Sequence, residues 1–199
     1  MNPRLFFIIL IAATIGGLAA LTMFANDSPT GNTGKVLIGG PFALTNHEGK
    51  RVTNEDFRGK YMLIAFGYTY CPDICPGELQ VIANAMDELG PKAGAIVPIF
   101  VSVDPQRDTV SHLADYVRNF SPRIVGLTGT EEEIKAAAKA YRVYYAKETS
   151  PSSSPGNEYL VSHSTFIYLM NPNGEYVTHF AYGITSEEMV AKLKKYVGG

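Results

Sequence analysis

Two long apolar runs, each followed by a segment with helical periodicity, restrict the possible fold classes of this chain more than its other features do. The runs are residues 61–68 (YMLIAFGY) and residues 95–103 (AIVPIFVSV). Apolar runs without polar alternation are typical of strands that are buried on both faces of a sheet. This order of strands and helices therefore predicts an α/β fold. The apolar positions of the two helical segments are Leu79, Ile82, Met86 and Leu89, and then Val110, Leu113, Ala114 and Val117.

The remaining segments extend this order with a further strand and helix and a carboxyl-terminal ββα unit. Residues 171–174 (NPNG) are typical of a hairpin turn, and residues 130–133 and 185–188 have the pattern of capping boxes. We expect an α/β sandwich around one central mixed sheet, with residues 147–158 as a surface loop. The further expected elements are short strands at residues 42–45, 50–52 and 124–127, a helix from Thr130, a hairpin of residues 165–170 and 176–181, and a final helix from Thr185 through Tyr196.

An uncharged apolar segment, residues 5–24, stands before this domain, with Arg4 on its amino-terminal side. As a helix it would cover about 30 Å, the thickness of the hydrocarbon core of a bilayer. Positive charge on the amino-terminal side predicts that this end stays in the cytoplasm and that the rest is exported. We therefore predict a transmembrane anchor at residues 1–25, a linker at residues 26–40 and an exported domain at residues 41–199. A cleaved signal peptide is the alternative, and it leads to export as well.

The composition excludes several classes of protein. The 17 basic and 19 acidic side chains are too evenly balanced for a nucleic-acid binder, which would show a basic patch. Aromatic and branched residues are too plentiful for a disordered chain, and two cysteines are too few for a disulfide scaffold. Because thiols outside the cytoplasm tend to be oxidised, the pair reads as a structural disulfide, a redox-active pair or a metal site.

Both cysteines lie between the first apolar run and its helix. Pro76 fits the first helical position, which would place Cys75 at the helix cap, where backbone N–H groups favour a thiolate. Four residues separate Cys71 from Cys75, so the two sulfurs can meet. An inert disulfide is the plainer interpretation, but closing so short a loop stabilises little. The pair also lies at the carboxyl end of a strand, where sites form, which indicates thiol–disulfide chemistry or a soft metal.

A third ligand would decide between these two kinds of chemistry, and the chain has four histidines. His47 lies in a polar turn, His112 in the first turn of a helix and His179 near a strand end, so each reads as a surface or packing residue. His163 stands at the entrance of the expected strand at residues 165–170. From the residues alone, it reads more readily as a loop histidine than as a ligand.

Three segments of the chain resemble the Sco/SenC family. They are residues 67–76 (GYTYCPDICP), 101–109 (VSVDPQRDT) and 162–174 (SHSTFIYLMNPNG), and shorter matches at residues 40–44 and 57–60 extend the likeness over nearly the whole exported domain. The resemblance implies a thioredoxin-like fold and a membrane-anchored copper chaperone for cytochrome c oxidase. It also implies a single-pass protein of the bacterial inner (cytoplasmic) membrane, with its domain facing the periplasm or the cell exterior.

The same resemblance implies a ligand set and partners. Cys71, Cys75 and His163 would bind one copper ion, as Cu(I) or Cu(II), which agrees with the softness of thiolates and the versatility of imidazole. Asp104 is a candidate for tuning the site or docking the target. The implied partners are subunit II of cytochrome c oxidase, or a related copper enzyme, as acceptor and another copper chaperone as donor.

Two enzyme hypotheses stand beside copper delivery to the binuclear copper (CuA) centre of that subunit. In the first, Cys71 and Cys75 are the catalytic residues of a thiol–disulfide oxidoreductase that reduces the CuA cysteines before metallation. In the second, a peroxidase of thioredoxin-like fold pairs one cysteine with a threonine and an arginine. Thr69 and Arg107 are the candidates for these two positions.

Overall fold

The structure is a computed structural model that describes residues 37–149 and 159–197. The predicted anchor at residues 1–25 and residues 26–36 of the predicted linker lie outside the described residues. Within the described ranges, no helix combines the length and the apolar character that a membrane span needs.

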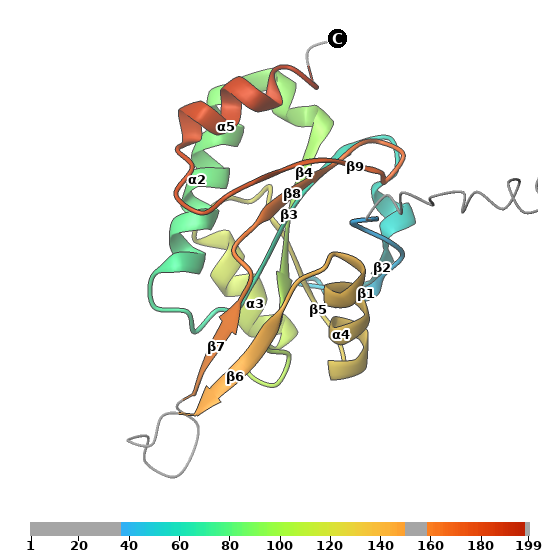
Figure 1. Ribbon diagram of the computed structural model, residues 1–199, viewed down its shortest axis with the longest axis vertical. Helices are drawn as coiled ribbons and strands as arrows, with labels where there is room; N and C mark the ends of the chain where they lie inside the picture. The colour runs from blue at the N-terminus through green and yellow to red at the C-terminus, as the bar shows by residue number, and fades with distance from the viewer. Residues whose placement is uncertain (1–36, 150–158, 198–199) are drawn as a thin grey trace, which may run out of the picture. The chain divides into compact units, whose positions relative to one another are not determined.

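A mixed sheet lies at the centre of the domain (Figure 1). Among the described residues it has seven strands in the order β2–β1–β5–β4–β3–β8–β9. β3 pairs in parallel with β4 and β4 with β5, whereas the outer strands pair antiparallel. The predicted α/β sandwich with a central mixed sheet is confirmed, and it fits a thioredoxin-like fold. The strands are β1 (Ala43–Asn46), β2 (Arg51–Thr53), β3 (Tyr61–Gly67), β4 (Ile96–Ser102), β5 (Val125–Thr128), β8 (Ile167–Met170) and β9 (Tyr176–Phe180).

Helices cover the sheet, and their starts follow the sequence signals. The predicted capping boxes are confirmed: the Thr130 hydroxyl accepts from the Glu133 N–H while the Glu133 carboxylate accepts from the Thr130 N–H, and Thr185 and Glu188 repeat the pattern. The final helix ends three residues before the predicted Tyr196, in hydrogen-bonded turns. The helical elements are η1 (Asn54–Phe57), α2 (Ile74–Leu89), η2 (Gly90–Ala95), α3 (Val110–Arg118), α4 (Glu131–Ala140) and α5 (Ser186–Leu193).

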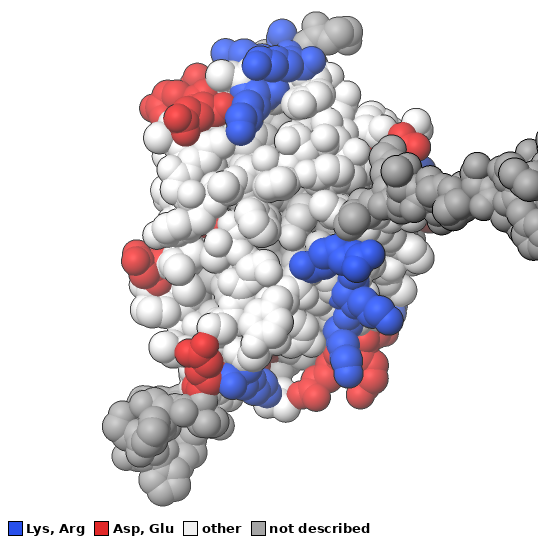
Figure 2. Space-filling view, in the orientation of Figure 1, with Lys and Arg blue, Asp and Glu red and all other residues white. Residues whose placement is uncertain are grey.

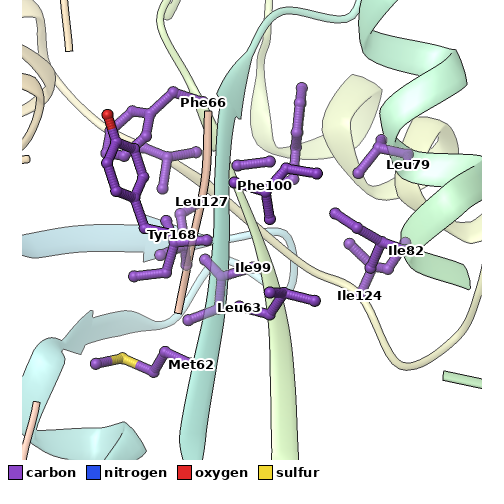
Figure 3. Close-up of a cluster of buried hydrophobic side chains, with 14 of the residues drawn as sticks. Met62, Leu63, Phe66, Leu79, Ile82, Ile99, Phe100, Ile124, Leu127 and Tyr168 are labelled. Carbon is purple, nitrogen blue, oxygen red and sulfur yellow. The ribbon is translucent and has the colours of Figure 1, made fainter. Parts of the chain in front are cut away.

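β3 is an enclosed strand, because side chains pack on both of its faces. In Figure 3, Phe66 and Tyr168 lie on one side of β3, and Leu79, Ile82 and Phe100 lie on the other. Every residue of β3 after Tyr61 is buried. This two-sided burial explains why the first apolar run lacks polar alternation, and it holds the carboxyl end of β3 firmly beside the start of α2.

A hairpin outside the central sheet departs from the sequence prediction. β6 (Tyr145–Thr149) and β7 (Tyr159–His163) pair antiparallel as a separate two-stranded sheet that extends away from the domain (Figure 1). The predicted surface loop is wrong at residues 147–149, which belong to β6, while residues 150–158 lie outside the described residues. The physical reason is that only Val161 of β7 is buried, so neither strand has the apolar run of a buried strand.

Gly67 permits the close approach of β3 to α2, which predicts the effect of adding a methyl group. A Cβ at Gly67 would lie 2.8 Å from Cys75 Sγ and 2.8 Å from the Phe100 ring. We expect Gly67→Ala to lower the free energy of unfolding, measured in urea, by about 1–3 kcal/mol because of overpacking. Gly77→Ala is the matched control, since a Cβ there has no heavy atom of residues 37–149 or 159–197 within 4 Å and alanine favours a helix. Equal stability of wild type and Gly67→Ala would contradict this packing.

Candidate metal centre

Cys71 and Cys75 lie where β3 passes into α2. The helix begins at Ile74 with Asp73 as its N-cap residue, so Cys75 lies inside the first turn and Pro76 follows it. The prediction that Pro76 takes the first helical position is therefore wrong by two residues. The proline is still tolerated because first-turn N–H groups have no acceptor within the helix. Cys75 is buried and Cys71 is half-buried, and both are free thiols.

The structure brings His163 to the two thiols from the end of β7. His163 Nε2 lies 3.3 Å from Cys75 Sγ, and the Cys75 N–H donates to Cys71 Sγ at 3.4 Å. His163 Nδ1 lies 2.9 Å from the Ser164 carbonyl oxygen. Because a carbonyl only accepts, Nδ1 carries a proton and Nε2 faces the sulfurs. One ligand atom from each of Cys71, Cys75 and His163 lies within 4.8 Å of the others, close enough to hold one metal ion.

The two thiols have opposite acidities. Hydrogen bonding by the Cys75 thiol, and then by His163 and the backbone N–H groups of Cys75 and Asp73, lowers the pKa of Cys71 to about 3 against the effect of burial. The hydrogen bond with Cys71 and burial raise the pKa of Cys75. Burial alone would lower the pKa of His163, but hydrogen bonds to Cys71 and Ser164 raise it. Cys71 is therefore the thiolate of the pair at neutral pH.

Asp108 fixes the loop that carries Cys71 (residues 68–73, the cysteine loop). Its carboxylate is fully buried and accepts from the Thr69 N–H at 3.1 Å and from the Thr69 and Ser102 hydroxyls at 2.6 Å each. Burial nevertheless raises the pKa of Asp108. Its neighbours have other partners, since Arg107 pairs with Asp104 and Thr109 caps α3.

Asp104 holds the hairpin that carries His163. The buried Asp104 carboxylate pairs with Arg107 and accepts from the Tyr159 hydroxyl at 2.6 Å. The Arg107 guanidinium lies 3.8 Å from the centroid of the Tyr159 ring, and Nη1 donates to the Tyr159 carbonyl at 3.0 Å. Tyr159 opens β7 and His163 closes it, so this cluster positions the strand of the histidine. Asp104 is absent from the group of ligand atoms, and its tuning or docking role stays a prediction.

The remaining sequence candidates make contacts of other kinds. His47 Nδ1 accepts from the Gly126 N–H, His112 stacks on Tyr70, and His179 lies 2.6 Å from the Tyr176 hydroxyl. Thr69 donates to Asp108 and Arg107 pairs with Asp104. The two side chains that a peroxidase would use are thus both engaged by carboxylates.

Sequence reasoning missed Glu78. This residue lies in α2, three residues after Cys75, and is 8% exposed. Its Oε1 is buried without a hydrogen-bond partner among the described residues, and burial raises the pKa of Glu78 to about 7. The spacing of Glu78 in the sequence could have identified it, since Cys75, Glu78 and Ile82 lie on one face of a helix.

These observations define a class of domain, a thioredoxin-like α/β sandwich with two thiols and one imidazole gathered at the carboxyl end of a central strand. Comparison with known proteins specifies it further. The chain belongs to the SCO1/SenC family, whose model matches residues 30–198, as the resemblance predicted.

Curated relatives come from mitochondria and from bacteria. The human mitochondrial SCO1 homologue is 43% identical over 82% of this chain and 54% of its own length. The protein sco1 of Schizosaccharomyces pombe is 44% identical over 86% of this chain and 65% of its own length. A SCO2-like protein of Rickettsia prowazekii is 39% identical over 80% of this chain and 77% of its own length. The chain thus spans about half to two thirds of the length of the two eukaryotic relatives.

Solved structures of relatives share the fold. Arabidopsis thaliana ScoI with copper bound is 44% identical, with a TM-score of 0.74 over 79% of this chain and 96% of that chain. Yeast Sco1 with copper bound is 40% identical, with a TM-score of 0.75 over 82% of this chain and 90% of that chain. At these identities the likeness extends beyond the fold to the family.

The acidity of Cys71 predicts its reaction with iodoacetamide, in which a thiolate attacks the CH₂ carbon, displaces iodide and forms a thioether. Because the pKa of Cys71 is about 3, its thiolate fraction hardly changes from pH 8 to pH 5, whereas an ordinary thiol of pKa about 8.5 is almost fully protonated at pH 5. We expect Cys71 to be modified first and at a nearly constant rate over this range, as followed by mass spectrometry of the reduced protein. A tenfold fall in rate per pH unit would contradict the prediction.

The contact between Asp104 and Tyr159 predicts the effect of removing one hydroxyl. Tyr159→Phe leaves a buried carboxylate oxygen without this donor, so we expect the free energy of unfolding to fall by about 1–3 kcal/mol. Amide hydrogen exchange should rise more in β6 and β7 than in β3. Tyr144→Phe is the control, because Tyr144 is 68% exposed. A Tyr159→Phe protein with unchanged exchange in the hairpin would show that Asp104 does not hold it.

Proposed function

We propose that this protein carries one copper ion on Cys71, Cys75 and His163 and delivers it to the CuA centre of cytochrome c oxidase subunit II. The observation that carries the proposal is the convergence of these three ligand atoms within 4.8 Å of one another. Membership of the SCO1/SenC family and the copper-bound structures of relatives from Arabidopsis thaliana and yeast support it.

The donor set suits both valences of copper. Two thiolates are soft ligands that favour Cu(I), and the imidazole makes the same site suitable for Cu(II). Cys71 is half-buried and lines an open pocket of about 330 Å³ together with His163 and Leu160. An acceptor thiolate can therefore approach the ion and replace these ligands one at a time, which moves the copper without any change in its valence.

The predicted anchor indicates on which side of the membrane the copper would be delivered. If residues 1–25 span the inner membrane, the domain faces the periplasm or the cell exterior beside membrane-bound oxidase subunits. Loading by another copper chaperone would then take place on the same side of the membrane. This part of the proposal rests on the uncharged segment at residues 5–24 and on the positive charge before it.

Removing the imidazole of His163 should affect the binding of Cu(I) and the binding of Cu(II) differently. We expect the reduced His163→Ala protein to keep Cu(I) on its two thiolates but to lose or change the thiolate-to-Cu(II) charge-transfer bands and the EPR spectrum of wild type. His179→Ala is the matched control, because His179 contacts Tyr176 and lies outside the group of ligand atoms. Optical absorption and EPR during Cu(II) titration make the measurement.

Two outcomes would contradict the ligand set. Identical Cu(II) spectra of wild type and His163→Ala would remove the third ligand from the proposal. Immediate oxidation of both proteins to the disulfide, with no copper retained, would favour the oxidoreductase instead.

The oxidoreductase is the second candidate, and the free pair of thiols favours it. The Cys71 thiolate would attack an acceptor disulfide, and Cys75, after losing its proton, would resolve the mixed disulfide and leave a Cys71–Cys75 disulfide behind. A strongly stabilised thiolate, however, makes a dithiol a weak reductant, so the low pKa of Cys71 favours copper delivery. Turnover of a disulfide peptide with a periplasmic reductant would support this second function.

A further inference from the structure

A second pocket opens beside the metal centre. It has a volume of about 250 Å³ and lies between the first two turns of α2, β8 and the loop that joins β9 to α5. Asp73 and Ile74 line both this pocket and the one that contains Cys71 and His163. The two openings are therefore neighbours, and one protein surface that reaches Cys71 can also cover the second pocket.

The walls of this pocket are mostly apolar, and the carboxyl groups of Asp73 and Glu78 also line it. Ile74, Val81, Ile167 and Ile184 contribute aliphatic side chains, and Glu78 contributes a carboxyl group whose buried Oε1 has no hydrogen-bond partner in the part of the chain that the structure describes. A buried oxygen of this kind is stabilised by a donor. The best occupant thus combines an apolar body with an N–H or O–H group, as a tyrosine or tryptophan side chain does.

The surroundings also suit a protein partner. Tyr182, which lines the pocket, is 60% exposed, and Phe166, next to the lining residue Ile167, is 42% exposed. Among the described residues, no lysine or arginine lines the pocket. The face in Figure 2 is largely uncharged over its centre, with charged side chains gathered toward its edges. Exposed aromatic residues around a small pocket are typical of the centre of a protein–protein interface.

We infer that this pocket, the docking pocket, receives one aromatic side chain of the copper acceptor and holds that protein over Cys71 during transfer. The inference rests on the proposed function, because the acceptor is the protein that takes the ion. It adds an anchor point separate from the ligands: an apolar ring packs between α2 and the β9–α5 loop, and its polar group donates to the Glu78 carboxyl group.

Gly77 allows the docking pocket to be filled without touching the ligands. It lies on the wall formed by α2, and a Cβ there would have no heavy atom of the described residues within 4 Å. Gly77→Leu should therefore occupy the pocket while the helix gains a residue of higher helix propensity. Gly94→Leu is the matched control, since Gly94 has the same free space around its Cβ and does not line this pocket.

The experiment measures the transfer of Cu(I) from the full-length protein in detergent to the reduced, copper-free CuA domain of oxidase subunit II. We expect Gly77→Leu to bind Cu(I) as tightly as wild type and to unfold at the same temperature or above it. Its second-order transfer rate should nevertheless fall by about tenfold or more, which is the loss expected for one central anchor. Gly94→Leu should transfer copper at the wild-type rate.

The outcomes separate this inference from the proposed function. Equal transfer rates for all three proteins would overturn the docking pocket and leave copper delivery intact. No transfer from any of them would contradict copper delivery and the inference together. Self-association of wild type that is lost in Gly77→Leu would identify a second copy of this chain as the occupant, which also overturns the inference.

Discussion

Two buried carboxylates on one short connection hold the candidate site together. Asp104 and Asp108 follow β4, both are fully buried, and the Asp108 N–H donates to the Asp104 carbonyl at 3.0 Å. Asp108 binds Thr69 of the cysteine loop, and Asp104 binds Tyr159 of the hairpin that ends in His163. A buried carboxylate is destabilising unless it is hydrogen-bonded. Breaking these hydrogen bonds is therefore costly, and each carboxylate holds its partner in place. The distance between thiols and imidazole is thus set by the turn that joins the two acids.

Features that depend on local sequence could be predicted, and features that depend on distant partners could not. The capping boxes at Thr130 and Thr185 need only residues three apart, so both were predictable. The position of the thiols at the end of a strand was also predictable, because the buried apolar run directly precedes them in the sequence. The β6–β7 hairpin has few buried side chains, and residues alone left His163 a loop histidine. Its place beside Cys75 depends on a contact between residues 88 apart in the sequence. The periodicity of apolar residues indicates local helices and strands and does not predict such a contact.

The proposed ligands belong to two structural units of different character. The thiols lie where β3 passes into α2. The end of β3 packs tightly against Cys75, since a Cβ added at Gly67 would lie 2.8 Å from Cys75 Sγ. The imidazole sits on a two-stranded sheet that shares no strand with the central sheet, joined to it through Arg107 and Tyr159. The central sheet therefore does not itself hold the imidazole, whose place beside the thiols depends on these side-chain contacts.

The sequence separation between the thiols and His163 has a consequence for the order of folding. The β3–α2 corner closes a short loop, whereas the histidine contact closes a loop of 88 residues, which costs more chain entropy and forms more slowly. During refolding, a two-coordinate thiolate site should appear before the three-coordinate one. The spectrum of a metal ion bound during refolding would then change as the hairpin docks, so the ion reports on completion of the fold.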